Sequence, residues 1–356
     1  MKIRLFFLLF MACYVPASAQ MPAYYNGIDL SLNGDNLKNA LGTLISNTHS
    51  NQLPYTSSSL QDTWDAIKVS DLRDGDTANV FLVYGYNDVD VITKNDRTRN
   101  KSLSCHTNSC AGLWNREHVF PRSLANPSMD TQFPGTGTDA HNLRAADGQM
   151  NGSRGNKLFD IGVGDGAIQT NGNFYPGDEW RGDVARIIMY MYVRYGSECQ
   201  AANVGAGSTS YSTLGDMPNV FLDWNASDPP TQYEKNRNSV FQSMQGNRNP
   251  FIDNPYLATK IWNGPQALNT WQGVSTDDFI LDQVKVYPSI TSTIVHIDDP
   301  KNVIKDIHVL NLMGQELIVP TESNSIDVST LSNGIYLLRL SSKQGNMTSK
   351  TIVVRD

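Results

Sequence analysis

The chain has 356 residues, of which 40% are hydrophobic and 18% charged, and its formal net charge is −7. This composition is ordinary for a globular protein and excludes a disordered or fibrous chain. The negative charge argues mildly against a protein that coats nucleic acid, because such proteins are usually basic. It does not exclude an enzyme that acts on phosphodiesters, since a local basic groove and a bound metal ion can serve the substrate inside an acidic shell. The length allows one large domain and a smaller one.

The first nineteen residues have the pattern of a signal peptide. Lys2 and Arg4 give a positive start, an almost unbroken apolar run covers 5–15, and Ala-Ser-Ala at 17–19 is a small-x-small cleavage site. The apolar run is too short for a comfortable membrane span, and no later window approaches eighteen consecutive apolar residues. Lipidation at Cys13 is disfavoured by the residues that precede it. We therefore expect an exported protein without a transmembrane segment in the mature chain. We also expect the protein to be a monomer.

Three cysteines remain after removal of the segment 1–19. Cys105 and Cys110 are close enough to bridge a short loop, as is usual outside the cytosol, with Cys199 left over or pairing differently. The alternative is a zinc knuckle in which His106 contributes a ligand. No second cysteine pair completes a set of four ligands, so the sequence favours the disulfide.

The segment 20–288 mixes helical patterns with loops rich in asparagine and glycine. Apolar side chains at helical spacing in 183–195 predict a helix that crosses the core. A second helix is expected at 230–244, and 80–84 is typical of a short strand. The segment as a whole predicts an α+β domain with more helix than strand.

The densest group of reactive side chains lies in three short stretches, at 114–121, 139–144 and 151–156. Hydrolysis of a phosphodiester needs a base that takes a proton from water, and a neutral histidine such as His118 suits that task. It also needs a hard cation near the phosphate. Because Mg²⁺ keeps several waters, one carboxylate and one amide oxygen are enough to bind it, and Glu117 and Asn151 supply these groups.

The geometry of a strand limits this interpretation. Neighbouring side chains point to opposite faces, so Glu117 and His118 share a site only at a twist or at a strand end, which Pro121 favours. Arg154 and Asn156 would then face the phosphate. On spacing alone a structural interpretation is the more frequent one, because asparagine and arginine in glycine-rich loops commonly form turns.

The same stretches resemble the active-site signature of the endonuclease I family of periplasmic or secreted nucleases. The similarity rests on Arg-Glu-His-Val-Phe-Pro at 116–121, His-Asn-Leu-Arg at 141–144 and Asn-Gly-Ser-Arg-Gly-Asn at 151–156. Residues 182–195 are similar to the central helix of the family, and 234–253 to its last block. The resemblance covers 37–262 as ordered motifs.

This resemblance implies a ββα-metal nuclease domain, rich in helices and loops, at 20–288. It implies that His118 is the general base and that Glu117 and Asn151 bind Mg²⁺, with Mn²⁺ or Ca²⁺ as alternatives. The substrate class is DNA, and in many members also RNA. Contacts that run mainly to the backbone would make cleavage nearly independent of sequence.

The resemblance also implies roles for further residues. Asn142 is expected to shape the site, and Arg144 and Arg154 are expected on the phosphate side. His141 is expected to be structural. The arginine that steadies the cleaved phosphate is not identified by the pattern, and Arg122 is one candidate.

The last part of the chain, 289–356, changes character. Strand-like stretches recur every ten to fifteen residues between turns that contain glycine, and this pattern predicts a small all-β sandwich. The stretches are 294–297, 307–312, 325–328, 334–340 and 350–354. By physics alone we would interpret the domain as a binding or anchoring module.

This domain also resembles the C-terminal sorting domain of proteins exported by the type IX secretion system of the Bacteroidetes. The similarity rests on 307–314, on 326–331 leading into Gly-Ile-Tyr at 334–336, and on 349–352. It implies the secretion machinery as a partner and an extracellular protein, released or attached to the outer cell surface.

Two other functions are weighed against the nuclease. One is a surface adhesin or nucleic-acid-binding module with an inactive nuclease-like domain, but Glu117, His118 and Asn151 are all present, which favours an enzyme. The other is a zinc metallopeptidase, which is disfavoured because no His-Glu-x-x-His occurs.

Overall fold

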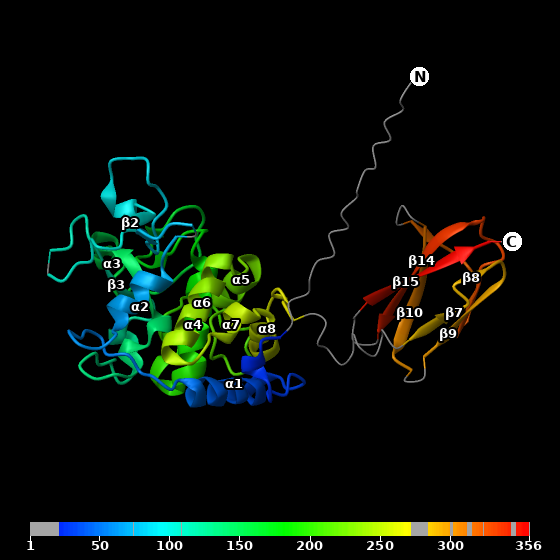
Figure 1. The fold of residues 1–356 in the computed structure, drawn as a ribbon, viewed down its shortest axis with the longest axis horizontal. Helices are drawn as coiled ribbons and strands as arrows, with labels where there is room; N and C mark the ends of the chain where they lie inside the picture. Colours follow the sequence, from blue (N-terminus) through cyan, green and yellow to red (C-terminus); the bar gives the residue numbers. More distant parts are fainter. Residues whose placement is uncertain are drawn as a thin grey trace, which may run out of the picture. The chain divides into compact units, whose positions relative to one another are not determined.

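The computed structural model describes residues 21–73, 75–107, 109–271, 284–299, 302–311, 315–322, 324–342 and 347–355. The expected signal peptide at 1–19 lies outside these residues. The described chain forms two compact units, Ala23–Thr270 and a C-terminal unit that begins at Trp271 (Figure 1). In the described part of the chain, no helix has both the length and the apolarity needed to span a membrane.

The first unit combines helices with short two-stranded sheets, which confirms the expected α+β class. Short 3-10 helices join several of its elements. In chain order the elements are α1 (Gly34–Thr48), α2 (Thr63–Ser70), β1 (Asn79–Phe81), β2 (Thr98–Asn100), β3 (Trp114–His118), β4 (Leu143–Asp147), α3 (Gly148–Arg154), β5 (Ala167–Ile168), β6 (Phe174–Tyr175), α4 (Arg181–Tyr195), α5 (Asn219–Ser227), α6 (Gln232–Gln245), α7 (Pro250–Asp253) and α8 (Tyr256–Trp262).

The helix expected at 183–195 is α4, which contacts α1, α5 and α7 and lies among these helices in Figure 1. Most of its residues are buried, so its apolar spacing marked a core helix correctly. The helix expected at 230–244 is α6. It begins with a reciprocal capping box between Thr231 and Glu234 and ends at Gly246, whose left-handed φ of 93° closes the helix.

The candidate motifs fold into one β-β-α succession. β3 and β4 pair antiparallel, with Glu117 opposite Arg144. α3 follows β4 directly, because the side chain of Asp147 accepts hydrogen bonds from the amide groups of Gln149 and Met150 in the first turn of the helix. α3 ends at Gly155, where φ is 55°. The expected ββα arrangement is therefore present, with its functional motifs on β3 and α3.

One local expectation differs from the structure, and one short helix was not predicted. The strand expected at 80–84 ends at Phe81, because Tyr84 adopts a left-handed φ of 72° that no strand accommodates. The segment 245–253 contains the short helix α7, which the sequence analysis did not predict. Asn249 caps this helix and Pro250 occupies its first turn, a local start signal that the apolar pattern does not carry.

The predicted disulfide is confirmed. Cys105 and Cys110 are bonded, with their Cα atoms 5.5 Å apart, so the zinc-knuckle alternative is excluded. Cys199 is a free, buried cysteine.

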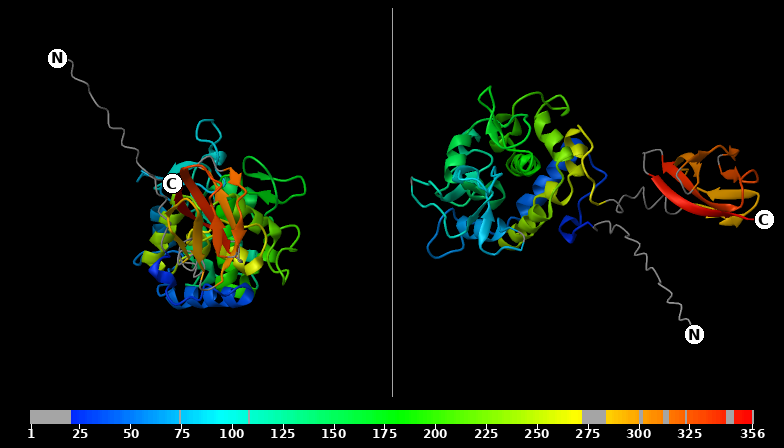
Figure 2. Two further views of the ribbon diagram at one scale, coloured as in Figure 1. Left: turned by 90° about the vertical axis from the view of Figure 1, so that its right-hand side faces the viewer. Right: turned by 90° about the horizontal axis from the view of Figure 1, so that it is seen from above.

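The C-terminal unit is a sandwich of two sheets, as expected, in the orders β11-β10-β14-β15-β8 and β12-β13-β9-β7. Figures 1 and 2 show the two sheets face to face, and residues of both sheets form one apolar core that includes Val295, Ile326, Leu338 and Ile352. The strands are β7 (Lys285–Tyr287), β8 (Ile290–Thr291), β9 (Ile294–Asp298), β10 (Ile304–Leu310), β11 (Glu316–Leu317), β12 (Thr321–Glu322), β13 (Ser325–Asp327), β14 (Gly334–Ser342) and β15 (Met347–Val354).

The boundary between the domains lies earlier than the expected position after residue 288. β7 pairs with β9, so the sandwich already includes Lys285–Tyr287. This strand is only three residues long and is followed by Pro288. For this reason the sequence pattern placed the end of the first domain at the proline.

Candidate active site

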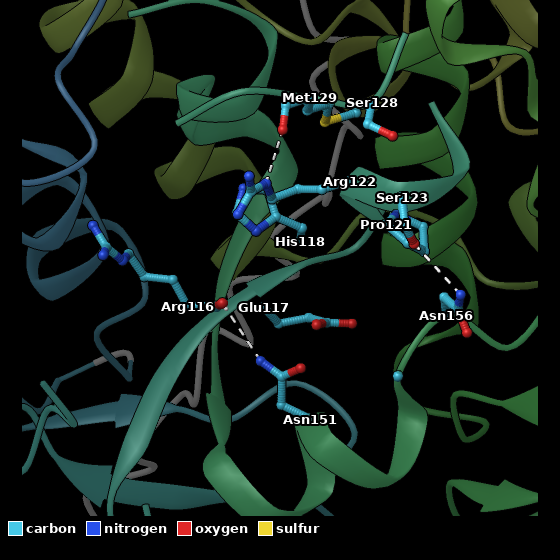
Figure 3. A pocket seen from close by; sticks show the side chains of 11 residues that line it. Arg116, Glu117, His118, Pro121, Arg122, Ser123, Ser128, Met129, Asn151 and Asn156 are labelled. Atoms are coloured by element: carbon cyan, nitrogen blue, oxygen red, sulfur yellow. Dashed lines mark hydrogen bonds between the residues drawn. The ribbon is translucent and has the colours of Figure 1, made fainter. Parts of the chain in front are cut away.

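A pocket of about 570 Å³ opens beside the end of β3. It is formed by the last residues of β3, the loop that follows them and the exposed side of α3, as Figure 3 shows. Its lining residues are Arg116, Glu117, His118, Pro121, Arg122, Ser123, Ser128, Met129, Asn151, Gly155 and Asn156. Glu117, His118 and Asn151 are thus brought together, because β3 ends at His118 and both neighbours reach the same pocket.

Glu117 presents a buried carboxylate with little opposing charge. The side chain is 3% exposed. Its Oε1 accepts a hydrogen bond of 2.9 Å from the Tyr84 hydroxyl and lies 3.4 Å from Nη1 of Arg154. Burial raises the pKa of Glu117 to about 7, although Arg154 and the Tyr84 hydrogen bond act to lower it. A bound cation would supply the additional positive charge that stabilises the ionised form of this buried carboxylate.

The amide of Asn151 is oriented by its neighbours. Its Nδ2 donates to Oδ1 of Asn115 at 2.8 Å and to the carbonyl oxygen of Arg116 at 3.4 Å. These contacts occupy the amide nitrogen and leave Oδ1 as the group available to a ligand. In Figure 3 the Asn151 side chain extends from α3 toward Glu117.

This donor set fits a hard divalent cation. One carboxylate and one amide oxygen are ligands that Mg²⁺ prefers, and Mg²⁺ fills its remaining positions with water and phosphate oxygens. The described residues contain no group of three or more histidine, cysteine or acidic side chains that would hold a metal ion. Such a group is typical of zinc sites and is not required for Mg²⁺.

The ring of His118 is held in one orientation. Its Nε2 lies 2.8 Å from the carbonyl oxygen of Gly137, and the ring stacks on Tyr55 with centroids 5.6 Å apart. Because a carbonyl oxygen only accepts, we assign the proton of the neutral ring to Nε2, which leaves a lone pair on Nδ1. Burial lowers the pKa of His118 to about 4. The ring is therefore neutral at neutral pH and able to accept a proton.

The loop that carries Gly137 is anchored to the helical core. Asp139, 1% exposed, accepts hydrogen bonds from the Tyr190 and Tyr195 hydroxyl groups and from Nε2 of Gln245. Gly137 itself is packed so closely that a Cβ atom would lie 2.0 Å from the carbonyl oxygen of Asp130. The carbonyl that orients His118 is thus fixed by residues on α4 and α6.

Asn142 and Arg154 do not line the pocket but bind the backbone segment that follows β3. Asn142 is fully buried. Its Oδ1 accepts from the Phe120 amide at 2.7 Å, and its Nδ2 donates to the Phe120 carbonyl at 3.1 Å. Arg154 is also fully buried and donates to the Val119 carbonyl at 2.9 Å. The expectation that Arg154 faces the phosphate differs from this placement, because its guanidinium is used by Glu117 and by the backbone after β3.

Arg144 lies in the core, and its expected position on the phosphate side is corrected. It is 1% exposed and donates to Asp183 at 2.8 Å. Its Nε lies 3.5 Å from Asp71, and its guanidinium lies 5.0 Å from the centre of the Trp180 ring. Two carboxylates neutralise this arginine, so it serves a buried ion cluster and has no free face for a phosphate.

Two other arginines line the pocket. Arg122 is exposed and uses its Nε to donate to the Met129 carbonyl at 3.0 Å. Arg116 lies over the rings of Tyr55 and Trp64, 3.4 Å and 4.0 Å from their centres. In the described part of the chain no carboxylate oxygen lies within 4.0 Å of either guanidinium. The terminal nitrogens of Arg116 donate to the Tyr55 carbonyl and to the Thr63 and Thr56 hydroxyl groups. Those of Arg122 are unbonded in the described residues, so Arg122 is the arginine that is free to contact an anionic substrate.

Sequence reasoning missed several supporting groups. Asn115 and Arg116 stand inside the recognised motif and could have been named from it. Tyr84 is buried, and its hydrogen bond to Glu117 has no local signal in the sequence. The Gly137 carbonyl is a backbone group, which a residue pattern does not identify.

His141 is buried against Tyr190 and Phe241 and lies outside the pocket.

Comparison with known proteins agrees with this geometry. Residues 33–256 match the family model of endonuclease I, and residues 285–355 match the secretion system C-terminal sorting domain. An extracellular ribonuclease of Bacillus subtilis (strain 168) is 35% identical over 268 residues, which cover 72% of this chain and 83% of the relative. An extracellular ribonuclease of Bacillus amyloliquefaciens is 36% identical over 259 residues, 70% of this chain and 81% of the relative.

A more distant match is a periplasmic deoxyribonuclease of Aeromonas hydrophila, 29% identical over 138 residues, which cover 36% of this chain and 52% of the relative. The endonuclease I match includes β3, β4 and α3 and therefore the whole candidate site. The sorting domain marks the protein as secreted. The chain belongs to the endonuclease I family and is a secreted nuclease with a C-terminal sorting domain.

Proposed function

We propose that this nuclease is a metal-dependent endonuclease that hydrolyses phosphodiester bonds of DNA and RNA with little sequence specificity. The observation that carries the proposal is the convergence of Glu117, Asn151 and a neutral His118 in one pocket. Relatives named as ribonucleases and as a deoxyribonuclease support both polymers as substrates. The charged groups of the pocket suit phosphate contacts, which carry no sequence information.

Glu117 and the Oδ1 atom of Asn151 would hold the cation. Mg²⁺ is the ion that this donor set favours, with Mn²⁺ or Ca²⁺ as alternatives. When bound, the cation supplies positive charge to the phosphate and to the leaving oxygen. Arg122 adds a second positive charge to the pocket, where its free terminal nitrogens can pair with a phosphate oxygen.

His118 acts as the general base. Its Nδ1 accepts a proton from the water whose oxygen attacks phosphorus, while the bond from phosphorus to the leaving oxygen breaks. The hydrogen bond from Nε2 to the Gly137 carbonyl keeps Nδ1 in position and stabilises the positive ring that forms. Phe120 lies two residues after His118, and the Asn142 side chain forms hydrogen bonds with its backbone. Asn142 therefore fixes the end of β3, which carries the base.

Removal of the cation is expected to abolish cleavage. Supercoiled plasmid incubated with the purified secreted protein and Mg²⁺ should be nicked and then degraded, and excess chelator should reduce the nicking rate by at least about 100-fold, since the cation contributes several kcal/mol of charge stabilisation. Adding Mg²⁺ beyond the chelator should restore the rate. Undiminished cleavage in the chelator would contradict metal dependence.

Loss of the Tyr84 hydroxyl is expected to weaken the metal site without unfolding the protein. Tyr84→Phe removes the hydrogen bond that orients the Glu117 carboxylate and leaves the ring in the core. Groups that orient metal ligands contribute about 10- to 100-fold to metal affinity or activity, so the Mg²⁺ concentration for half-maximal nicking should rise by about that factor.

The matched control is Tyr175→Phe, whose hydroxyl bonds Asp178 and which does not line the pocket. It should leave the Mg²⁺ requirement unchanged. An unchanged requirement in Tyr84→Phe would show that Glu117 needs no support from this hydroxyl.

A further inference from the structure

A second hollow, of about 260 Å³, lies on another side of α3. Its walls come from the loop before β2, from the β5–β6 hairpin and from two residues of α3. The residues that bear on its chemistry are Tyr86, Ile92, Lys94, Asn95 and Ile168. Its volume is just below the roughly 300–1,000 Å³ of small-molecule sites, a size for one flat group rather than for a duplex.

Helix α3 connects this hollow to the candidate active site. Asn151 lines the first pocket, whereas Met150 and Ser153 line the second. Met150 and Ser153 are three positions apart and share a helix face, which Asn151 does not. A helix with its side chains is about 10–12 Å across. A nucleic-acid strand with stacked bases advances about 3.4 Å per nucleotide, so about three nucleotides span the width of the helix.

The walls offer flat and apolar surfaces to a ligand. Tyr86 is half-buried and lines the hollow. Ile92 and Ile168 are 55% and 50% exposed, although both are large apolar side chains. An aromatic ring between exposed aliphatic groups is the kind of surface on which a nucleobase stacks.

Two polar groups add directionality. Lys94 has no carboxylate oxygen within 4.0 Å in the described part of the chain. Asn95 is 5% exposed, and its Nδ2 donates to Asp90 at 3.0 Å, but its Oδ1 has no hydrogen-bond partner among the described residues. A buried amide oxygen without a partner is rare in folded proteins. Because this oxygen is itself buried, a donor on a ligand reaches it only when the walls around it shift slightly.

We propose that this hollow is a subsite for one unpaired nucleobase of the substrate strand, about three nucleotides from the bond that is cut. Tyr86 stacks on the base, Asn95 accepts a hydrogen bond from a base N–H group, and Lys94 pairs with a nearby phosphate. A base held in a duplex does not enter, so the enzyme favours single-stranded or locally unpaired nucleic acid. This inference rests on the proposed function, because it needs a polynucleotide in the active site.

Direct binding of short oligonucleotides tests the subsite separately from catalysis. The probes are a fluorescently labelled single-stranded 12-mer of mixed sequence, as DNA and as RNA, and the corresponding duplexes, all measured by anisotropy in chelator. Tyr86→Ala should weaken single-strand binding by about 5- to 150-fold, the loss that corresponds to one base–aromatic stack. Tyr86→Phe should bind as the unaltered enzyme does, and duplex binding should be unchanged in both variants.

Lys94→Ala gives a second measurement that does not depend on the packing of Tyr86. It should lower the slope of log Kd against log salt for the single strand by about 0.7, as expected for one lost phosphate contact. Tyr211→Ala, a partly exposed tyrosine that lines neither pocket, is the matched control and should bind both probes normally.

Equal losses on single strand and duplex, or no loss in Tyr86→Ala, would overturn the subsite. If Lys94→Ala left the salt slope unchanged, its phosphate contact would be refuted. Metal-dependent plasmid cleavage by the unaltered enzyme is measured in parallel. Its absence would refute the proposed function, whereas normal cleavage combined with unaltered single-strand binding in Tyr86→Ala would refute only the subsite.

Discussion

The His118→Ala variant is expected to lose about 10²- to 10⁴-fold in turnover, the usual contribution of a positioned general base. The alanine removes the Nδ1 acceptor, whereas Glu117 and Asn151 remain to hold the cation. Single-turnover nicking of supercoiled plasmid at saturating Mg²⁺ measures the chemical step. Titration calorimetry with Mn²⁺ should give an affinity within about threefold of the unaltered enzyme, because no ligand has been removed.

The matched control is His106→Ala. His106 lies in the disulfide loop, contacts Ser104 and Trp64, and does not line the pocket. Its replacement should leave turnover nearly unchanged. If His118→Ala cleaved plasmid at the normal rate, another group would have to be the base. A collapse of Mn²⁺ affinity in this variant would assign His118 to the metal instead.

The residues of the pocket were predictable from the sequence where the information is local. Glu117 and His118 are neighbours on β3, and Asn151 follows on the helix that continues from β4. A short β-β-α succession fixes how these groups meet, so the order and spacing of the motifs carry their geometry. The central helix and the main strands of the sandwich were predictable for the same reason, since their apolar periodicity is a local property.

The contact partners of the long charged side chains were not predictable from the local sequence. Arg144 and Arg154 stand in the same motifs as the pocket residues, but their partners are set by tertiary contacts. Arg144 pairs with Asp183, 39 positions away, and Arg154 reaches Glu117, 37 positions away. A motif shows that an arginine is present, but only the packed fold shows which carboxylate or carbonyl it contacts. The same holds for Gly137, whose contribution is a carbonyl group.

The second large effect is expected from Glu117→Gln. Glutamine keeps the volume and can still bond Tyr84, but it carries no charge to attract a cation. The Mg²⁺ concentration for half-maximal nicking should rise by at least about 100-fold, more than for loss of an orienting group alone. Turnover at any practical Mg²⁺ concentration should fall by a similar factor.

A thermal measurement tests the same assignment without any turnover. A cation that binds only the folded enzyme raises the midpoint of unfolding as its concentration increases. In the unaltered enzyme Mg²⁺ bound at Glu117 would also neutralise a buried carboxylate, so the midpoint should rise clearly. In Glu117→Gln that rise should be nearly absent, whereas Glu179→Gln, which alters an exposed carboxylate paired with Arg97, should keep it. If Mg²⁺ stabilised Glu117→Gln as strongly as the unaltered enzyme, Glu117 would not be a ligand.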